Sequence, residues 1–526
     1  MTTKLIKRAV FIAIAVLLSI TAFAQRDGNN LKVKIHIVKA KAGDTLFLVV
    51  QKNYLSRRIS ILDEDKGDFY PGVLDKNGMC EFPVVIIDSP VYISLRKDYA
   101  QGDLNSLPRE LFSDYLALPD DNITITADRI EELPYNLLAL KGLRFDGDGA
   151  AKYRFTRDMK MIAENWKQGE ASMARSNKMR DTLASRHFKA LYPIQIVEGL
   201  ERCEAIRSLR CERLDFYRNE MHTTEYEILS ADILGDYLLE KQNILFRFYS
   251  NDVIENAVEP RVRKHRKELF GMLDTIKHKD IYFFSRSLAD AFVRIKRVQA
   301  NYLMKKDPFG LFITEPDRLM KEKLLTIYLL QQKKFVNEKI VAQTAEALEY
   351  ITNEYYISLL KQTIYALAPG VDAVPFELPD EAGNRISLHD FRGKLVFIDF
   401  WYNGCSGCAS YFKNVLSSLE KDYQNEDNLV FVTIAIDRNK DKWKKAIRSG
   451  VYTSAHAVNL YTDGLGDKHR VIDDYKVYSY PRPILISPDG KIITSDRGFM
   501  ANDEWVRKTI EKELAMIKKE KSLPHI

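Results

Sequence analysis

Two cysteines separated by two residues stand where an apolar segment gives way to an amphipathic one. Residues 394–401 are almost uninterruptedly apolar, which is typical of a buried strand, although the carboxylate Asp399 lies among them. Cys405 and Cys408 follow, and apolar residues then recur at helical spacing, at positions 412, 415, 416, 419 and 423. A buried strand that leads into a helix is the repeating unit of α/β proteins, so we expect a sheet covered by helices here.

The chain beyond the two cysteines continues this alternation. A second buried strand is expected at residues 429–436 and a hairpin over residues 482–494. Periodic apolar residues near the end predict a closing helix, which Asn502 or Asp503 could cap. Residues 369–526 therefore predict an α/β domain around a central sheet.

The position of Cys405 and Cys408 indicates redox chemistry. The helix dipole favours a thiolate at the start of a helix, and thiols of Cys-x-x-Cys pairs have a pKa well below that of free cysteine. We expect Cys405 to be accessible there and Cys408, one turn further on, to be more buried. A purely structural disulfide is an alternative, because disulfides persist in proteins outside the cytosol. A zinc site would need a second pair of ligands, which the sequence does not offer.

The other three cysteines, Cys80, Cys203 and Cys211, are expected to be buried structural thiols. Cys203 and Cys211 are eight residues apart in a helical pattern, or about 12 Å along a helix. A disulfide requires Cα atoms within about 7 Å, so this pair cannot be bridged within one helix. The chain is no disulfide scaffold, and no metal site is expected.

The first residues predict export. Three basic residues among the first eight precede an apolar run over residues 9–20, and Ala22-Phe23-Ala24 has the small residues of a cleavage site. We interpret residues 1–24 as a signal peptide and expect the mature chain to be soluble in the cell envelope, in a bacterial periplasm, without spanning the membrane. A membrane anchor is the alternative, although the apolar run is shorter than the ~17 residues needed to span a bilayer.

The mature chain shows two further patterns before the α/β domain. Residues 25–148 predict a β-rich domain that ends in a turn at residues 146–149. Its strands are expected at residues 31–37, 45–50, 58–62, 81–87, 91–95 and 123–126. Residues 149–368 have apolar residues at three- and four-residue spacing and predict an all-α region. The net charge of +6 is small for 526 residues and gives no indication of a nucleic-acid partner.

Three stretches of the C-terminal third match a known family pattern, namely AVPFELPDEAGNRISLHDFRGKLVFIDFWYNGCSGC, VFVTIAID and YSYPRPILISPDGKII. Through them, residues from about 369 to 518 resemble the TlpA/ResA-type thioredoxin-like family of exported disulfide oxidoreductases. The resemblance implies a protein disulfide reductase without a cofactor, in which Cys405 attacks and Cys408 resolves. The partners it implies are disulfide-bearing envelope proteins as substrates and a membrane or envelope thiol protein as electron donor.

The resemblance also assigns residues around the cysteines. Pro481 matches the family's cis-proline, and the backbone beside it, at Tyr480, would pair with the substrate chain. Asp399 matches the carboxylate buried beneath the resolving cysteine, where burial raises a carboxyl pKa and lets the group relay a proton. The resemblance also places Trp401, an aromatic residue beside the site, among the substrate-binding residues, although core packing explains it equally well.

Five positions depart from the family pattern. Gly404 replaces thioredoxin's tryptophan before the first cysteine, and Ser406-Gly407 replaces its Gly-Pro pair. Tyr411 stands where many relatives have a glutamate, and Thr433 aligns with the lysine that faces the buried acid. The redox potential and the handling of protons therefore stay open.

Two other classes of function share parts of this pattern. A peroxiredoxin-like peroxidase would have proline seven residues and Thr or Ser three residues before the reactive cysteine, where this chain has Ile398 and Tyr402. A non-catalytic scaffold protein is the other alternative, because two thirds of the chain lie outside the resemblance.

Overall fold

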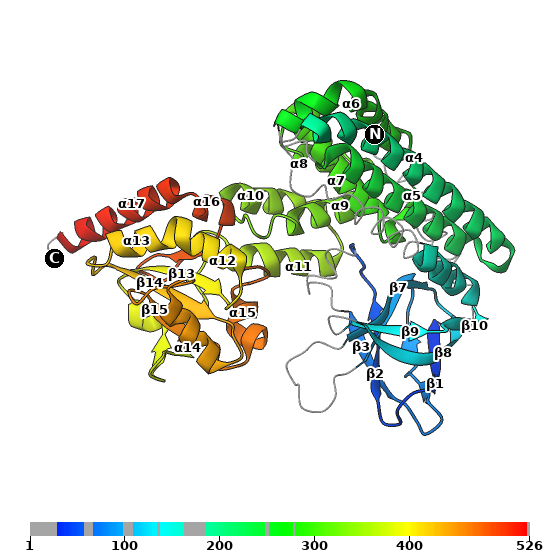
Figure 1. The fold of residues 1–526 in the computed structure, drawn as a ribbon, viewed down its shortest axis with the longest axis horizontal. Coiled ribbons are helices and arrows are strands. Elements are labelled where there is room, and N and C mark those ends of the chain that lie inside the picture. The colour runs from blue at the N-terminus through cyan, green and yellow to red at the C-terminus, as the bar shows by residue number, and fades with distance from the viewer. Residues whose placement is uncertain are drawn as a thin grey trace, which may run out of the picture. The chain divides into compact units, whose positions relative to one another are not determined.

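The computed structural model describes most of the chain beyond the predicted signal peptide (Figure 1). The described residues are 29–56, 67–97, 109–133, 137–162, 186–247, 252–276 and 279–522. The signal peptide predicted at residues 1–24 therefore lies outside them. Two compact units divide the chain, Met1–Leu324 (unit 1) and Leu325–Ile526 (unit 2). The expected order of β-rich, helical and α/β regions is confirmed, whereas the bounds proposed for these regions stay a prediction.

Two sheets form the β-rich part of unit 1 among the described residues. The first has the order β10-β8-β1-β4, with β5 on β1 and β9 on β8. Its strands are β1 (Asn30–Lys39), β4 (Met79–Glu81), β5 (Val85–Ile86), β8 (Asn122–Leu133), β9 (Leu137–Lys141) and β10 (Arg144–Asp148). The second, in the order β3-β2-β6-β7, consists of β2 (Thr45–Gln51), β3 (Asp68–Val73), β6 (Val91–Lys97) and β7 (Arg109–Ala117). One apolar core joins residues of both sheets.

The strand pattern was largely predictable. The alternating apolar residues of β1 are buried, namely Leu31, Val33, Ile35 and Ile37. The turn predicted at residues 146–149 is wrong over Asp146 to Asp148, because these residues pair with β8 as part of β10. The strand expected at residues 58–62 lies outside the described residues.

The central region is helical, as expected. Besides the helical residues 150–162, its described helices are α4 (Arg186–Phe216), α5 (Thr223–Phe246), α6 (Asp252–Thr275), α7 (Leu288–Gln299), α8 (Phe309–Ile313) and α9 (Arg318–Leu330). Cys203 and Cys211 both lie in α4. Cys80 and Cys203 are buried, as predicted. Cys211 is exposed, so the prediction of a buried thiol is wrong for this residue. In the described part of the chain, no helix is both long and apolar enough to cross a bilayer.

Unit 2 is built on a five-stranded sheet in the order β15-β14-β13-β16-β17. Its strands are β13 (Leu395–Trp401), β14 (Leu429–Ala435), β15 (Val458–Tyr461), β16 (Ile484–Ile486) and β17 (Ile492–Thr494). The first three pair in parallel, and β16 runs antiparallel to β13 and β17. This confirms both predicted buried strands and the hairpin. A short hairpin of β11 (Glu377–Pro379) and β12 (Arg385–Ser387) precedes the sheet, after α10 (Glu338–Ala347) and α11 (Glu354–Ile364).

Helices cover both faces of this sheet. α12 (Ser406–Tyr411), a π-helical turn (Phe412–Leu416) and α13 (Ser417–Asp422) follow one another without a break. α14 (Lys440–Ser449) shares their face, as successive right-handed crossovers require. α17 (Asp503–Ser522), preceded by α16 (Arg497–Met500), packs on that face too (Figure 1), and α15 (Arg470–Asp474) covers the other. Asn502 caps α17 as predicted, accepting a 2.9 Å hydrogen bond from the backbone N–H of Trp505.

Candidate active site

Cys405 and Cys408 form a disulfide beyond the carboxyl end of β13, with Cα atoms 5.2 Å apart. Cys405 is the N-cap residue of α12, and its Sγ accepts a 3.0 Å hydrogen bond from the backbone N–H of Cys408. Cys405 is 5% exposed and Cys408 is 1% exposed. The relative burial agrees with the expectation, but the prediction of an accessible Cys405 is wrong for the disulfide form.

A tight loop between β13 and α12 positions Cys405. Gly404 has a φ of 96°, which lies in the region that glycine adopts without strain. Its backbone N–H donates a 2.9 Å hydrogen bond to the hydroxyl of Tyr452, whose ring stacks on Trp401 at 5.2 Å between centroids. Tyr452 follows α14 and is distant in sequence, so no local pattern pointed to it. Trp401 and Tyr452 together hold the loop against the core.

The segment Tyr480-Pro481 lies against the disulfide. Its peptide bond is cis, as the resemblance implied. A Cβ atom added to Gly407 would lie 3.5 Å from the carbonyl oxygen of Tyr480 and 3.6 Å from Cδ of Pro481, so the two segments are in close contact. The Tyr480 ring meets Tyr402 edge-on at 5.3 Å between centroids. The backbone before Pro481 therefore flanks the Cys-x-x-Cys segment.

Asp399 is a carboxyl group buried beneath this site. Successive side chains of a strand point to opposite faces of the sheet, so Asp399 lies on the same face of β13 as Phe397 and Trp401. These two side chains pack below α12 and the cysteines. Its Oδ1 accepts a 3.0 Å hydrogen bond from the backbone N–H of Arg482. Burial raises the pKa of Asp399 to about 8, although this hydrogen bond opposes the rise. Asp399 therefore holds a proton at neutral pH, near the disulfide.

Thr433 and Tyr411, at two of the positions that depart from the family pattern, donate their hydroxyl groups to partners other than Asp399. Thr433 is opposite Asp399 in the pairing of β13 with β14, as the alignment predicted, but its hydroxyl donates to Asn459 Oδ1 at 2.8 Å. Tyr411 donates its hydroxyl to the carbonyl of Met500 at 2.8 Å, and burial raises its pKa well above the ordinary range. Neither residue supplies the lysine or glutamate of the relatives.

A cation approaches Asp399 from another element instead. The Arg497 guanidinium, at the start of α16, donates to Ser479 Oγ at 3.1 Å and to the Tyr480 carbonyl at 3.4 Å. Its positive charge lowers the pKa of Asp399, against the larger effect of burial. Arg497 thus binds the segment before Pro481 while its charge acts on the buried acid, and nothing in the local sequence pattern singled it out.

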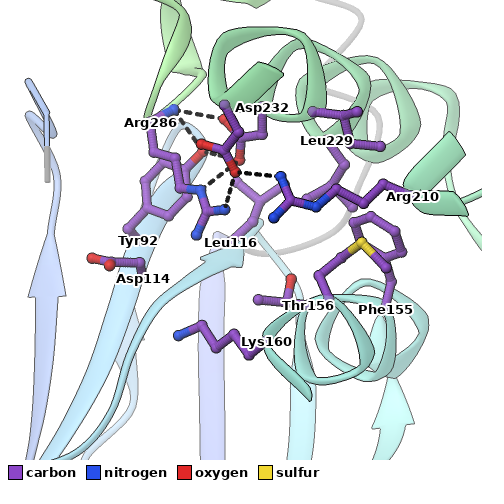
Figure 2. Close-up of a pocket in the computed structure, with 13 residues that line it drawn as sticks. Tyr92, Asp114, Leu116, Phe155, Thr156, Lys160, Arg210, Leu229, Asp232 and Arg286 are labelled. Carbon is purple, nitrogen blue, oxygen red and sulfur yellow. Dashed lines mark hydrogen bonds and ion pairs between the residues drawn. The ribbon is translucent and has the colours of Figure 1, made fainter. Parts of the chain in front are cut away.

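A second polar site lies in unit 1, where a cavity of about 120 Å³ is lined by β6, β7, helical residues 150–162, α4 and α5 (Figure 2). Its charges neutralise one another. Arg210 and Arg286 both donate to Asp236 Oδ2, at 3.4 and 3.2 Å, while Tyr92 and the backbone N–H of Arg286 donate to Asp232 at 3.1 and 2.8 Å. Burial nevertheless raises the pKa of Asp232 to about 6. Such mutual pairing favours a structural role within the unit.

Across the described residues, no cluster of three or more His, Cys, Asp or Glu side chains could hold a metal ion.

Comparison with known proteins places the redox site in a family. A family model described as thioredoxin-like matches residues 393–492. The chain is 30% identical over 135 residues to the thiol-disulfide oxidoreductase ResA of Bacillus subtilis (strain 168), covering 26% of this chain and 70% of the relative. It is 28% identical over 139 residues to the thioredoxin-like protein YneN of the same organism, covering 26% of this chain and 77% of the relative.

Among solved structures, a thiol:disulfide interchange protein from Bacteroides sp. is 30% identical to the chain, with a TM-score of 0.24. The match covers 28% of this chain and 92% of that protein. The family assignment rests on the sequence relatives, which match the segment that carries Cys405 and Cys408. Through its C-terminal domain, the chain belongs to the ResA-type thioredoxin-like thiol-disulfide oxidoreductases.

Proposed function

We propose that the protein is exported and reduces protein disulfides in the cell envelope, with Cys405 as the attacking and Cys408 as the resolving cysteine. The observation that carries this assignment is the unequal placement of the two sulfurs. Cys405 caps the helix beside Tyr480-Pro481, whereas Cys408 lies in the first turn, above the face that holds Asp399. Cys405 is the less buried of the two cysteines, so we assign it the attack on the substrate disulfide.

The reaction begins from the reduced dithiol. The Cys405 thiolate attacks a substrate sulfur, so that the substrate disulfide breaks, one substrate thiolate leaves and a mixed disulfide forms. The Cys408 thiolate then attacks Cys405 Sγ, which releases the second substrate thiolate and closes the Cys405–Cys408 disulfide. Two electrons pass to the substrate, and its two thiolates take up two protons. A thiol protein of the membrane or envelope returns the two electrons.

Asp399 serves in this proposal as the proton carrier for Cys408. A thiol must lose its proton before it can attack, and a carboxyl group with a pKa near the working pH exchanges protons efficiently. Tyr480 and Pro481 present backbone to the substrate. Trp401 is fully buried, so we assign it a packing role in place of the substrate contact that the resemblance implied.

Export is proposed from the sequence of residues 1–24 and from the family resemblance. Expression of the full-length chain and of a form without residues 2–24, followed by cell fractionation, tests it. Only the full-length form should reach the envelope fraction. Equal amounts of both forms in the cytosol would contradict export.

Turnover of a peptide disulfide with a small dithiol as donor tests the activity. The full chain should reduce the peptide, and Cys405→Ser should not. Equilibration with glutathione then gives the direction, because dithiol proteins span potentials from about −270 to −120 mV. A potential near the oxidising end would contradict the reductase function, and absence of turnover in the unsubstituted chain would favour a scaffold.

A further inference from the structure

A second buried carboxyl group lies on the same face of the sheet as Asp399. Glu420, in α13, is 1% exposed. Its Oε2 accepts a 2.5 Å hydrogen bond from the hydroxyl of Ser454, while Oε1 is buried and has no hydrogen-bond partner in the described residues. In the described part of the chain no ion pair joins Glu420 to a cation, and burial raises its pKa to about 7. Buried polar atoms without a hydrogen-bond partner are few in native proteins, so this carboxyl group requires an explanation.

A chain of hydrogen bonds leads from Glu420 to the strand position beside Asp399. The Ser454 carbonyl accepts a 2.9 Å bond from Asn459 Nδ2. Asn459 Oδ1 in turn accepts a 2.8 Å bond from the hydroxyl of Thr433, which is opposite Asp399 in the strand pairing. Glu420 is therefore linked, through Ser454 and Asn459, to Thr433, the residue that occupies the place of thioredoxin's lysine.

The groups that act on Asp399 come from several elements. The backbone N–H groups of Arg482 and Phe400 and the charge of Arg497 stabilise its ionised form. Burial and the negative charge of Glu420 oppose ionisation. Tyr411 also interacts with Asp399, but its own pKa is raised far above neutrality, so it stays uncharged. In the described part of the chain, Glu420 is thus an acidic side chain whose charge raises the pKa of Asp399.

We propose that Glu420 is a positioning residue for disulfide exchange, which keeps a proton on Asp399 beneath the Cys405–Cys408 pair. The inference rests on the proposed role of Asp399 as proton carrier. Once ionised, Glu420 repels a second negative charge, so Asp399 stays protonated and can give its proton to Cys408 when the disulfide is reduced. The same proton returns to Asp399 when Cys408 is deprotonated for its attack, so the exchange is balanced.

The test is an infrared titration of the full chain and of Glu420→Gln between pH 5 and 10. The carboxylic-acid band of Asp399 is assigned by its loss in Asp399→Asn. Glu420→Gln should lower the pH at which Asp399 loses its proton by roughly one unit, the size expected for one charge in a buried site. The pH profile of peptide-disulfide reduction should shift by the same amount. Below about pH 6, where Glu420 is itself protonated, the two proteins should be alike.

Two further variants make the outcome decisive. Ser454→Ala removes the hydrogen bond that stabilises ionised Glu420, so it should shift the Asp399 titration in the same direction by a smaller amount, even if Glu420→Gln does not fold. Asp422→Asn, on the same helix but exposed and paired with Arg507, should cause no shift.

An unmoved Asp399 band in Glu420→Gln and Ser454→Ala overturns the inference and leaves the oxidoreductase function standing. A moved band with an unmoved rate profile overturns the positioning role, because Asp399 then takes no part in the reaction. Loss of peptide reduction by the unsubstituted chain overturns the proposed function itself, which separates the two failures.

Discussion

The carboxyl group of Asp399 accepts a 3.0 Å hydrogen bond from the backbone N–H of Arg482, the residue directly after Pro481. The buried acid is therefore tied to the segment that flanks the disulfide, and not only to the strand that carries it. Any movement of Tyr480-Pro481 on substrate docking changes a bond that stabilises ionised Asp399. Proton handling and substrate contact share one short stretch of backbone.

Asp399→Asn should stabilise unit 2 at alkaline pH. The folded state holds the Asp399 proton up to about pH 8, whereas the unfolded chain releases it near pH 4, so the free energy of unfolding falls as the pH rises between these values. This decrease in the free energy of unfolding is at most about 5 kcal/mol, and it is absent in Asp399→Asn because asparagine does not ionise. Urea unfolding followed by tryptophan fluorescence should show a small difference at pH 4 and a large one at pH 9. Equal differences at both values would contradict the raised pKa.

Arg497→Gln should act on Asp399 in the direction opposite to Glu420→Gln. Removal of the positive charge takes away an influence that lowers the pKa of Asp399, so the pH profile of peptide reduction should move to higher pH. Arg507→Gln is a matched control, because Arg507 pairs with Asp422 and Asp503. A shift in the control as large as that in Arg497→Gln would show that the effect comes from net charge.

Gly407 offers a test of the substrate-binding backbone. A Cβ atom there would lie 3.5 Å from the Tyr480 carbonyl, which is an ordinary contact, so Gly407→Ala should retain activity. A longer side chain, as in Gly407→Leu, should cover that carbonyl. If two backbone hydrogen bonds to the substrate are lost at about 1 kcal/mol each, kcat/KM should fall about 30-fold, mainly through KM. An unchanged KM in Gly407→Leu would place the substrate elsewhere.

The sequence predicted what depends on local pattern. The apolar run at residues 394–401 and the helix after Cys408 were recognisable because periodicity reflects burial. β7 was missed because Ser113-Asp114 interrupts its apolar run, and Asp114 has a φ of 58° where the pairing with β6 shifts register.

The missing parts of the site come from distant segments. Tyr452, Arg497 and Glu420 reach the site only through the packing of α13, α14 and α16 around the sheet. A charged residue on a helix normally faces solvent, so the sequence alone predicts Glu420 to be a surface residue. In the structure, the loop that carries Ser454 covers it. Cys211 illustrates the reverse case, because a single cysteine gives no signal of which helix face it occupies.

The two cysteines should divide the reaction between them. Cys405, as the outer residue and N-cap, should attack substrates first, and Cys408 should break the mixed disulfide. Cys408→Ser should therefore accumulate covalent adducts with envelope proteins, and a reductant should cleave these adducts. Non-reducing gels followed by mass spectrometry should detect the adducts and name the substrates.

Cys405→Ser is the matched control for this trap, because it retains the buried thiol and removes the outer one. It should accumulate few adducts, since Cys408 is 1% exposed and shielded by the helix that carries it. More adducts in Cys405→Ser than in Cys408→Ser would reverse the assignment of the two roles. If neither variant traps a protein although both fold, the C-terminal domain does not exchange disulfides with proteins, and the scaffold alternative gains support.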